Sequence, residues 1–185
     1  MSAAVESGPP SDEALGELVM DTIVAIPDFP TPGVLFYDFT PLLGGADAFR
    51  AVVDGMVRRY AGRVDVVVGI EARGFVLGAA AAYALGVGFV PVRKEGKLPG
   101  KTVREEYTLE YGSAVLELGA TALRPGQRVL VVDDVLATGG TVAATCDLVE
   151  RAHARVEAID VVLEIEALGG RRRLTGRELT SLARV

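Results

Sequence analysis

Two adjacent carboxylates followed by a run of small residues are the part of the sequence best suited to chemistry. Asp133 and Asp134 end a Val-rich stretch, and the Ala-Thr-Gly-Gly-Thr segment 137–141 then opens a helical pattern. Backbone N–H groups at a helix start form an anion site, to which threonine hydroxyls can add donors. Glycine lets a phosphate approach the backbone closely. Carboxylates beside that site can accept hydrogen bonds from sugar hydroxyls, so the pattern predicts a pocket for a ribose 5-phosphate.

A second unusual loop, Glu71-Ala72-Arg73-Gly74, follows another Val-rich stretch. Further along, the segment 94–112 interrupts the regular pattern and is rich in Lys and Arg over its first half. Its alternation over 102–109 predicts a small hairpin. About twenty residues without core periodicity inside a compact domain are typical of a lid or binding loop.

The elements around these loops alternate between strands and helices. Strands are expected at 64–70, 87–93, 128–133 and 156–165, and helices at 49–60, 74–85 and 140–152. Such alternation predicts an α/β fold with a parallel sheet covered on both faces. Ligands in these sheets bind where the carboxyl ends of the strands meet loops. An earlier helix is expected to begin after Ser11 and to run to Ile26, before a proline-rich loop that extends to Thr40.

Length and composition limit the class of protein. The chain has 185 residues, which suits one domain at 11–185 after a disordered segment 1–10. Its net charge of −6 argues against binding nucleic acid, which requires Lys and Arg at phosphates. The single Cys146 is interpreted as buried packing. With only one His as well, His153, no metal site built directly by the protein is expected.

The uncharged run 75–92 is long enough to cross a membrane. It is weakly hydrophobic and interrupted by Gly86, Gly88 and Pro91, so we interpret it as a buried helix followed by a buried strand. We expect no association with a membrane, and we expect the protein to be cytoplasmic. The Arg171–Arg173 run is interpreted as a solvated turn, with anion contact as the alternative.

The stretch 131–141 closely resembles the signature with which type I phosphoribosyltransferases bind phosphoribosyl pyrophosphate (PRPP). Other segments are similar to the adenine phosphoribosyltransferase family: 29–33 with Phe36, 69–75, 90–99, 109–112 and 125–127. The resemblance extends over roughly residues 15–182. It implies a central parallel sheet flanked by helices, with a small hood and a flexible loop, and a homodimer. The implied activity is purine salvage, in which PRPP and adenine give AMP and pyrophosphate with Mg²⁺ bound through PRPP.

The resemblance also assigns residues to roles. Those implied in catalysis are Glu110, Arg73, Asp133 and Asp134, with Tyr111 on the same mobile loop as Glu110. The 5-phosphate would lie against Ala137, Thr138, Gly139, Gly140 and Thr141. Pyrophosphate would be bound by Glu71, Ala72, Arg73, Gly74, Arg93, Lys94 and Lys97, with a cis peptide just before Arg73. Adenine would contact Leu35, Phe36, Tyr37 and Leu136, with Phe36 stacking on the base.

One position departs from the family pattern and leaves alternatives open. Tyr37 follows Phe36 where the family usually has Arg. Backbone groups at this position can still read adenine whatever the side chain is. The first alternative is a transferase for hypoxanthine, guanine or xanthine, and the second is a non-catalytic regulator that binds PRPP. A regulator of that kind would need an added DNA-binding module and a basic face, which this acidic chain does not favour.

Overall fold

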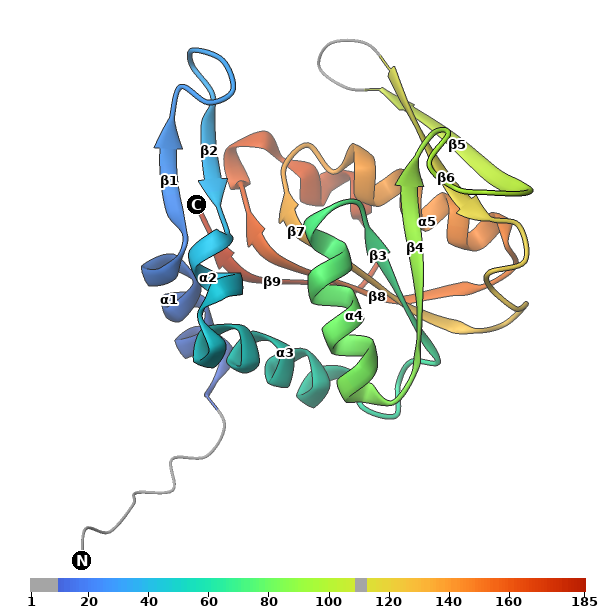
Figure 1. Ribbon diagram of the computed structural model, residues 1–185, viewed down its shortest axis with the longest axis horizontal. Coiled ribbons are helices and arrows are strands. Elements are labelled where there is room, and N and C mark those ends of the chain that lie inside the picture. The colour runs from blue at the N-terminus through green and yellow to red at the C-terminus, as the bar shows by residue number, and fades with distance from the viewer. Residues whose placement is uncertain (1–9, 109–112) are drawn as a thin grey trace, which may run out of the picture.

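A seven-stranded sheet forms the centre of the computed structural model, which describes residues 10–108 and 113–185. The parallel strands are β3 (Val66–Ile70), β4 (Gly88–Lys94), β7 (Arg128–Leu136), β8 (Arg155–Glu164) and β9 (Leu179–Arg184). An antiparallel hairpin of β5 (Thr102–Thr108) and β6 (Ser113–Gly119) extends the β4 edge. The order is β5-β6-β4-β3-β7-β8-β9 (Figure 1). The predicted fold class is confirmed.

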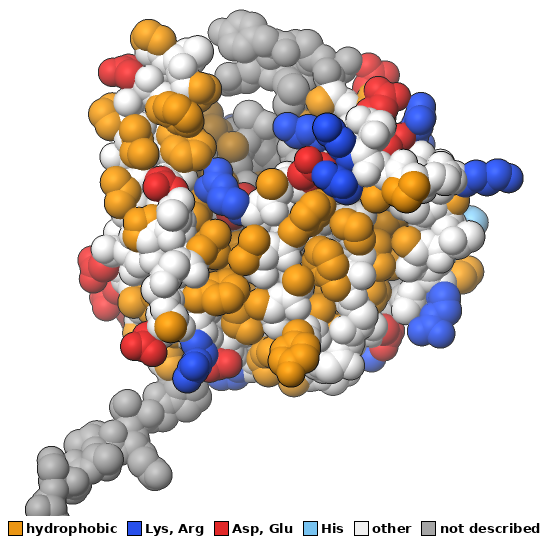
Figure 2. Space-filling model, viewed as in Figure 1, with side chains coloured by type: hydrophobic (Ala, Val, Ile, Leu, Met, Phe, Trp, Pro, Cys, Tyr) orange, Lys and Arg blue, Asp and Glu red, His pale blue; other side chains and the backbone are white. Residues whose placement is uncertain are grey.

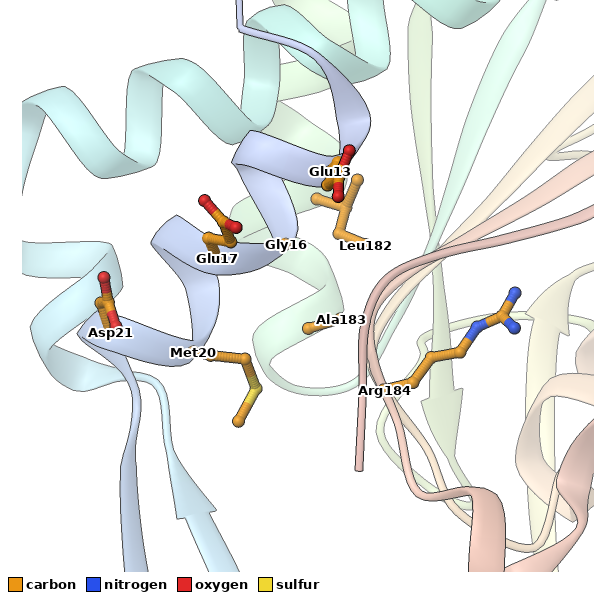
Figure 3. Close-up of a pocket in the computed structure, with 8 residues that line it drawn as sticks. All are labelled: Glu13, Gly16, Glu17, Met20, Asp21, Leu182, Ala183 and Arg184. Atoms are coloured by element: carbon orange, nitrogen blue, oxygen red, sulfur yellow. The ribbon is translucent and has the colours of Figure 1, made fainter.

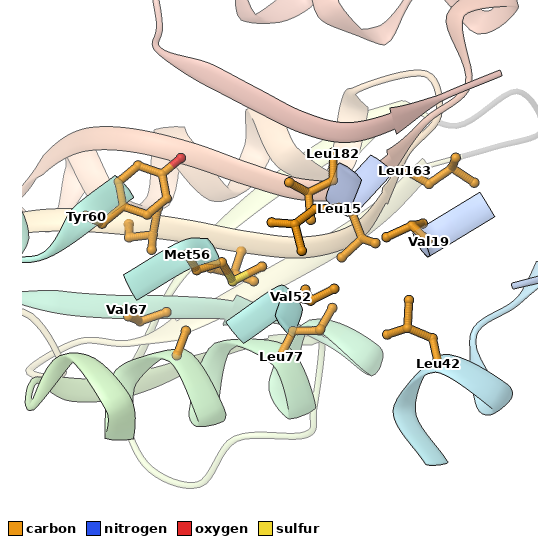
Figure 4. Close-up of a cluster of buried hydrophobic side chains, with 14 of the residues drawn as sticks. Leu15, Val19, Leu42, Val52, Met56, Tyr60, Val67, Leu77, Leu163 and Leu182 are labelled. Atoms are coloured by element: carbon orange, nitrogen blue, oxygen red, sulfur yellow. The ribbon is translucent and has the colours of Figure 1, made fainter. Parts of the chain in front are cut away.

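Helices cover both faces of the sheet, which is why the central strands are apolar along their whole length. All five residues of β3 are buried. One face packs against α1 (Asp12–Thr22), α3 (Ala46–Tyr60) and α4 (Arg73–Leu85), and Figure 4 shows Leu15, Val52 and Leu77 of these helices meeting in one cluster. The other face packs against α5 (Gly140–Arg151) through a second cluster.

The first helix is shorter than predicted, because its apolar spacing continues into a strand. Ser11 caps α1 as expected, its hydroxyl accepting from the Ala14 N–H. The helix ends at Thr22, and β1 (Val24–Pro27) then pairs with β2 (Leu35–Asp38) as an antiparallel hairpin. The prediction of helix to Ile26 and loop to Thr40 is therefore wrong. The β-branched residues at 23, 24 and 26 fit a strand as well as a helix face, and pairing with β2 decides between them.

Other differences lie at element ends and in the C-terminal third. The strand predicted at 128–133 continues to Leu136, so both acidic residues of the motif belong to β7. A short helix α2 (Thr40–Gly44), two 3-10 turns (Glu166–Leu168 and Gly170–Leu174) and β9 were not predicted. The solvated-turn interpretation is wrong for Arg171, which is half-buried and pairs with Glu164, while Arg172 and Arg173 are exposed.

Two predictions about apolar residues can be checked directly. Cys146 is fully buried, as predicted, and burial raises the pKa of its thiol to about 12. Among the helices of the described residues, none has the length and hydropathy required to cross a membrane.

A buried ion pair ties α3 to β8. Asp160 is fully buried, and its Oδ2 accepts from Arg59 Nε at 3.1 Å and Nη2 at 2.9 Å. Arg59 Nη1 also lies 2.7 Å from Asp12 of α1. Burial raises the pKa of Asp160, against the lowering effect of Arg59. A carboxylate in this place depends on its partner, because an unpaired buried charge is strongly destabilising.

We therefore expect Arg59→Met to reduce the free energy of unfolding by about 3–5 kcal/mol at neutral pH, because it leaves the Asp160 charge buried without a partner. Urea denaturation followed by circular dichroism would measure the change. The loss should shrink as pH falls, since protonation removes the buried charge. Asp160→Leu combined with Arg59→Met should recover most of the stability.

Asp12→Asn serves as the control, because Asp12 is 53% exposed and its removal should cost less than about 1 kcal/mol. An Arg59→Met variant that is no less stable than Asp12→Asn would contradict this role of the pair.

Candidate active site

A cleft of about 480 Å³ opens at the carboxyl ends of the parallel strands. In Figure 1 the β1–β2 hairpin and the β5–β6 hairpin rise on opposite sides of this rim. The cleft is lined by Glu71, Ala72, Arg73, Lys94, Tyr107, Ala114, Leu116, Asp133, Asp134 and Thr141. Seven of these ten were selected from the sequence, and the seven come from three separate segments of the chain, 71–73, Lys94 and 133–141.

The two carboxylates of β7 have different environments. Asp133 is 8% exposed, and its Oδ1 accepts from the Asp134 N–H at 2.9 Å. Burial, and next the charge of Asp134, raise the pKa of Asp133 well above its usual value. Asp134 faces Arg73, whose Nη1 lies 2.7 Å from Asp134 Oδ2, an ion-pair distance without the orientation of a hydrogen bond. Two neighbouring carboxylates, one of them buried, can accept hydrogen bonds from the hydroxyl groups of a ligand.

The start of α4 lies directly against β7 at Val132 and Asp133. A Cβ placed on Gly74 would lie 2.8 Å from the Val132 carbonyl oxygen and 3.1 Å from Asp133 Oδ1. No side chain fits in that space, so glycine lets the 71–74 loop approach the carboxylates. The cis peptide of this loop joins Glu71 to Ala72, one bond earlier than the expected place just before Arg73.

Arg73 connects the cleft to the β1–β2 hairpin. Its Nη1 donates to the Tyr37 carbonyl oxygen at 3.2 Å, and its guanidinium lies 5.2 Å from the Phe36 ring centre and 5.1 Å from that of Phe39. Cations are attracted to aromatic faces at such distances. The residue expected at the pyrophosphate therefore also contacts the carbonyl expected to read the base.

Basic residues of β4 are held by Glu71. Its Oε2 accepts from Arg93 Nε at 3.1 Å and from the Lys94 N–H at 3.2 Å. Burial acts to raise the pKa of Glu71, but these two donors outweigh it and hold the pKa below its usual value. Arg93 also donates to the Lys97 carbonyl at 3.0 Å. Lys94 lines the cleft, whereas the side chain of Lys97 is exposed outside it.

The small-residue segment lies in a depression next to the cleft. Leu136, Ala137, Thr138, Gly139 and Thr141 line it, and Asp133 and Thr141 belong to both spaces. Gly139 has a φ of 78°, a left-handed conformation that glycine adopts readily, and Gly140 begins α5. Backbone N–H groups at a helix start attract anions, so the geometry fits a phosphate beside the carboxylates.

A model of the phosphoribosyl transferase domain matches residues 44–172. The adenine phosphoribosyltransferase of Acidothermus cellulolyticus is 55% identical over 178 residues, which cover 96% of this chain and 99% of that protein. The chain belongs to the adenine phosphoribosyltransferase family. The sequence-based prediction of that family is thereby confirmed.

Solved structures of family members share the fold. The Thermoanaerobacter pseudethanolicus enzyme has a TM-score of 0.88 and 46% identity, over 91% of this chain and 99% of that one. The Saccharomyces cerevisiae enzyme, in complex with adenine and an imino-altritol bisphosphate, has a TM-score of 0.86 and 37% identity, over 91% of this chain and 98% of that one.

The residues that family resemblance assigns to adenine lie in different parts of the structure. Leu35, Phe36 and Tyr37 lie on β2, where Phe36 packs edge-on against Phe29 with ring centres 5.0 Å apart. Leu136 is fully buried and lines the depression beside the cleft. Glu110 and Tyr111 lie outside the described residues.

Three lining residues were missed. Tyr107 lies in the hairpin predicted at 102–109, whose position across the sheet the sequence did not reveal, and Ala114 and Leu116 lie on a strand beyond it that was not predicted. Tyr107, Ala114 and Leu116 line the cleft from one face of the β5–β6 hairpin. Buried Glu117 of β6 fixes the turn before them, accepting from the Gly96 N–H at 2.9 Å and from the Thr102 hydroxyl at 3.2 Å. Alternation in 102–109 was the one available signal.

A second hollow of comparable size lies far from these residues. It runs between α1 and the end of β9, and Figure 3 shows Glu13, Glu17 and Asp21 along one side with Arg184 across from them. It is a shallow acidic surface that shares no lining residue with the cleft.

The environment of Asp133 predicts a stability cost. Its pKa in the folded chain lies above that of an unfolded aspartate, so ionised Asp133 disfavours folding as pH rises through the folded pKa. We expect Asp133→Asn to raise the melting temperature of the ligand-free protein at pH 8. The gain should vanish below the ordinary carboxyl pKa, where both states are protonated. Calorimetric scans from pH 8 down to the acid limit would measure it.

Asp54→Asn makes the same substitution at an exposed carboxylate of α3 and serves as the control, without a gain that depends on pH in this way. A melting temperature for Asp133→Asn that never exceeds that of wild type at pH 8 would mean that the carboxylate is not strained by burial.

Proposed function

We propose that this chain transfers the 5-phosphoribosyl group of PRPP to adenine, giving AMP and pyrophosphate, at the cleft between β3, β4 and β7. The observation that carries the proposal is the joint placement of Asp133, Asp134 and the start of α5 around one space. Membership of the adenine phosphoribosyltransferase family gives the reaction, and the residues below give its parts. The reaction belongs to purine salvage.

One side of the cleft binds the phosphate and the sugar of PRPP. Backbone N–H groups of 137–141 and the hydroxyls of Thr138 and Thr141 bind the 5-phosphate. Asp133 and Asp134 accept hydrogen bonds from the 2′- and 3′-hydroxyls. As pyrophosphate departs, positive charge develops on the sugar, and the carboxylates stabilise it because they are fixed in place before the reaction.

The leaving group is neutralised on the other side of the cleft. The 71–74 loop, Arg73 and Lys94 face the space next to the carboxylates. Arg93 and Lys97 follow on the same segment and add positive charge. Glu110, which follows β5 in the sequence, is the proton-handling group at the purine, and Tyr111 is the next residue of the same segment. No covalent intermediate with the protein is needed, since positioning and charge stabilisation suffice.

Magnesium fits this site as a partner of PRPP. Within the described part of the chain, no cluster of three or more His, Cys, Asp or Glu side chains could hold a metal alone. Mg²⁺ commonly keeps its waters and binds through substrate phosphates. When bound it would neutralise part of the pyrophosphate charge, while Asp133 and Asp134 would hold its waters or the diol.

The backbone of Tyr37 reads the base. Its carbonyl already accepts from Arg73, yet a carbonyl oxygen has two lone pairs and can accept from the adenine amine as well. Hypoxanthine and guanine carry an oxygen at that position, and two acceptors would then face each other. A site built on such hydrogen bonds rejects the wrong base strongly.

A homodimer is supported by the outer face of α4. The inner face of this helix is buried, yet Val76, Ala79 and Tyr83 are exposed at helical spacing, with Tyr83 91% exposed. Figure 2 shows hydrophobic side chains gathered over α4 on the face turned to the viewer. A helix that is apolar all round is typically buried on both sides, and a second copy of the chain would cover this one.

The experiment that tests the proposed function is incubation with PRPP and Mg²⁺ and each of adenine, hypoxanthine, guanine and xanthine, with nucleotide detected by chromatography. We expect AMP from adenine as the main product. The Asp133→Asn/Asp134→Asn double variant should lose turnover by at least tenfold, which corresponds to about 1.4 kcal/mol of transition-state stabilisation.

Glu157→Gln/Glu166→Gln removes two carboxylates outside the cleft and is the matched control. A folded Asp133→Asn/Asp134→Asn variant with near-normal turnover would contradict the role assigned to the two carboxylates. Binding of PRPP without nucleotide formation from any base would favour the regulator instead.

A separate prediction concerns Tyr37. If the backbone reads adenine, Tyr37→Arg should change the adenine kcat/KM by less than about threefold, because the carbonyl stays in place. Phe36→Ala should raise the adenine KM clearly, since it removes the aromatic face and the ring that orients Arg73. The measurement is kcat/KM for adenine and hypoxanthine in all three proteins. A gain of orders of magnitude in Tyr37→Arg would show that the side chain sets base choice.

A further inference from the structure

The 3-10 turn at Gly170–Leu174 lies directly behind the small-residue segment of the phosphate depression. A Cβ added to Gly139 would lie 2.5 Å from the Gly170 carbonyl oxygen. A Cβ added to Gly170 would lie 2.8 Å from the Gly139 nitrogen and would collide with the Ala137 carbonyl oxygen. The two backbones are therefore in direct contact, and neither position has room for a methyl group.

Arg171 fastens the turn to the strands beneath it. Its Nε donates to Glu164 Oε1 at 2.9 Å and its Nη2 to Glu164 Oε2 at 2.5 Å. The same side chain donates to the Ser181 hydroxyl at 2.9 Å and to the Leu179 carbonyl at 3.2 Å. Paired N–H groups on one carboxylate fix direction as well as distance. Arg171 thus joins the turn to both β8 and β9.

Glu164 anchors this contact at the strand from which the phosphate segment leaves. It is 4% exposed and is the last residue of β8, where it pairs with Leu136 at the end of β7. Hydrogen bonds from Arg171 hold the pKa of Glu164 below its usual value. The carboxylate is therefore charged and held, and the distance between Gly170 and the 137–139 backbone is fixed.

We propose that Gly170 and Arg171 are positioning residues for the 5-phosphate, acting through the loop 137–141. The proposal rests on the proposed function of that loop. Backbone N–H groups bind an anion well only when they are held in one arrangement. The Ala137 carbonyl oxygen faces Gly170, so its partial negative charge is kept at the rear of the loop. The turn supports the loop from behind and contacts no substrate.

The test is a series of variants assayed for AMP formation, with the KM of PRPP and of adenine and the kcat determined separately. Gly170→Ala should raise the PRPP KM at least tenfold and leave the adenine KM within twofold. Arg171→Gln should shift the PRPP KM in the same direction. Arg171→Lys should rescue part of the loss, because an ammonium keeps the charge but not the two-pronged contact.

Two further variants keep the test decisive. Ser181→Ala removes one contact of Arg171 and should raise the PRPP KM about two- to threefold without a folding defect. Arg173→Ala alters an exposed arginine of the same turn and should leave both KM values unchanged. The affinity of each protein for ribose 5-phosphate, measured by titration calorimetry, should follow the PRPP KM.

The outcomes distinguish the proposed function of the cleft from the positioning role of Gly170 and Arg171. A wild type that neither binds ribose 5-phosphate nor forms AMP overturns the proposed function itself. A functional wild type with an unchanged PRPP KM in both Gly170→Ala and Arg171→Gln overturns the positioning role alone. Variants that lower the melting temperature while the PRPP KM stays constant would likewise assign the turn to stability only.

Discussion

Close contact between α4 and β7 at Gly74 is the constraint on which the site depends. The first turn of the helix that follows β3 lies against Val132 and Asp133 of β7, with no space for a side chain. Neighbouring parallel strands provide this meeting point, since their carboxyl ends share one rim. A larger residue at 74 would push the 71–74 loop away from the carboxylates, and the two sides of the cleft would separate.

That contact also accounts for the charges of the cleft. Bringing α4 over β7 buries Asp133 and raises its pKa, and it places Arg73 at ion-pair distance from Asp134. Each acid and base is supported by a neighbour: Glu71 by Arg93, and Arg73 by the Tyr37 carbonyl. The charged groups are therefore held in place before any ligand binds, and this lowers the stability of the folded protein. Such a loss is common where activity requires charges that are shielded from water.

Much of the fold could be predicted because Val-rich strands alternate with helices. The motif at 133–141 predicted residues that the structure brings together at the cleft and the depression beside it. The hairpin β1–β2 escaped because Val24–Pro27 continues the apolar spacing of α1, and only pairing with Leu35–Asp38 distinguishes the two. β9 escaped because its pattern is weak and its support comes from β8. Tyr107 and Leu116 could not be assigned to the cleft, since that depends on how their hairpin crosses the sheet.

Because the cleft is assembled from β3, β4 and β7, the concentration of substrate affects how long the folded protein persists. In the unfolded chain these segments are dispersed, so a ligand of the cleft can bind only the folded form. A ligand with that preference adds about 2.7 kcal/mol to stability when its concentration is a hundredfold above Kd. A cell rich in PRPP would then keep more of this chain out of reach of its proteases, and depletion would shorten the protein's half-life before it slowed any single turnover.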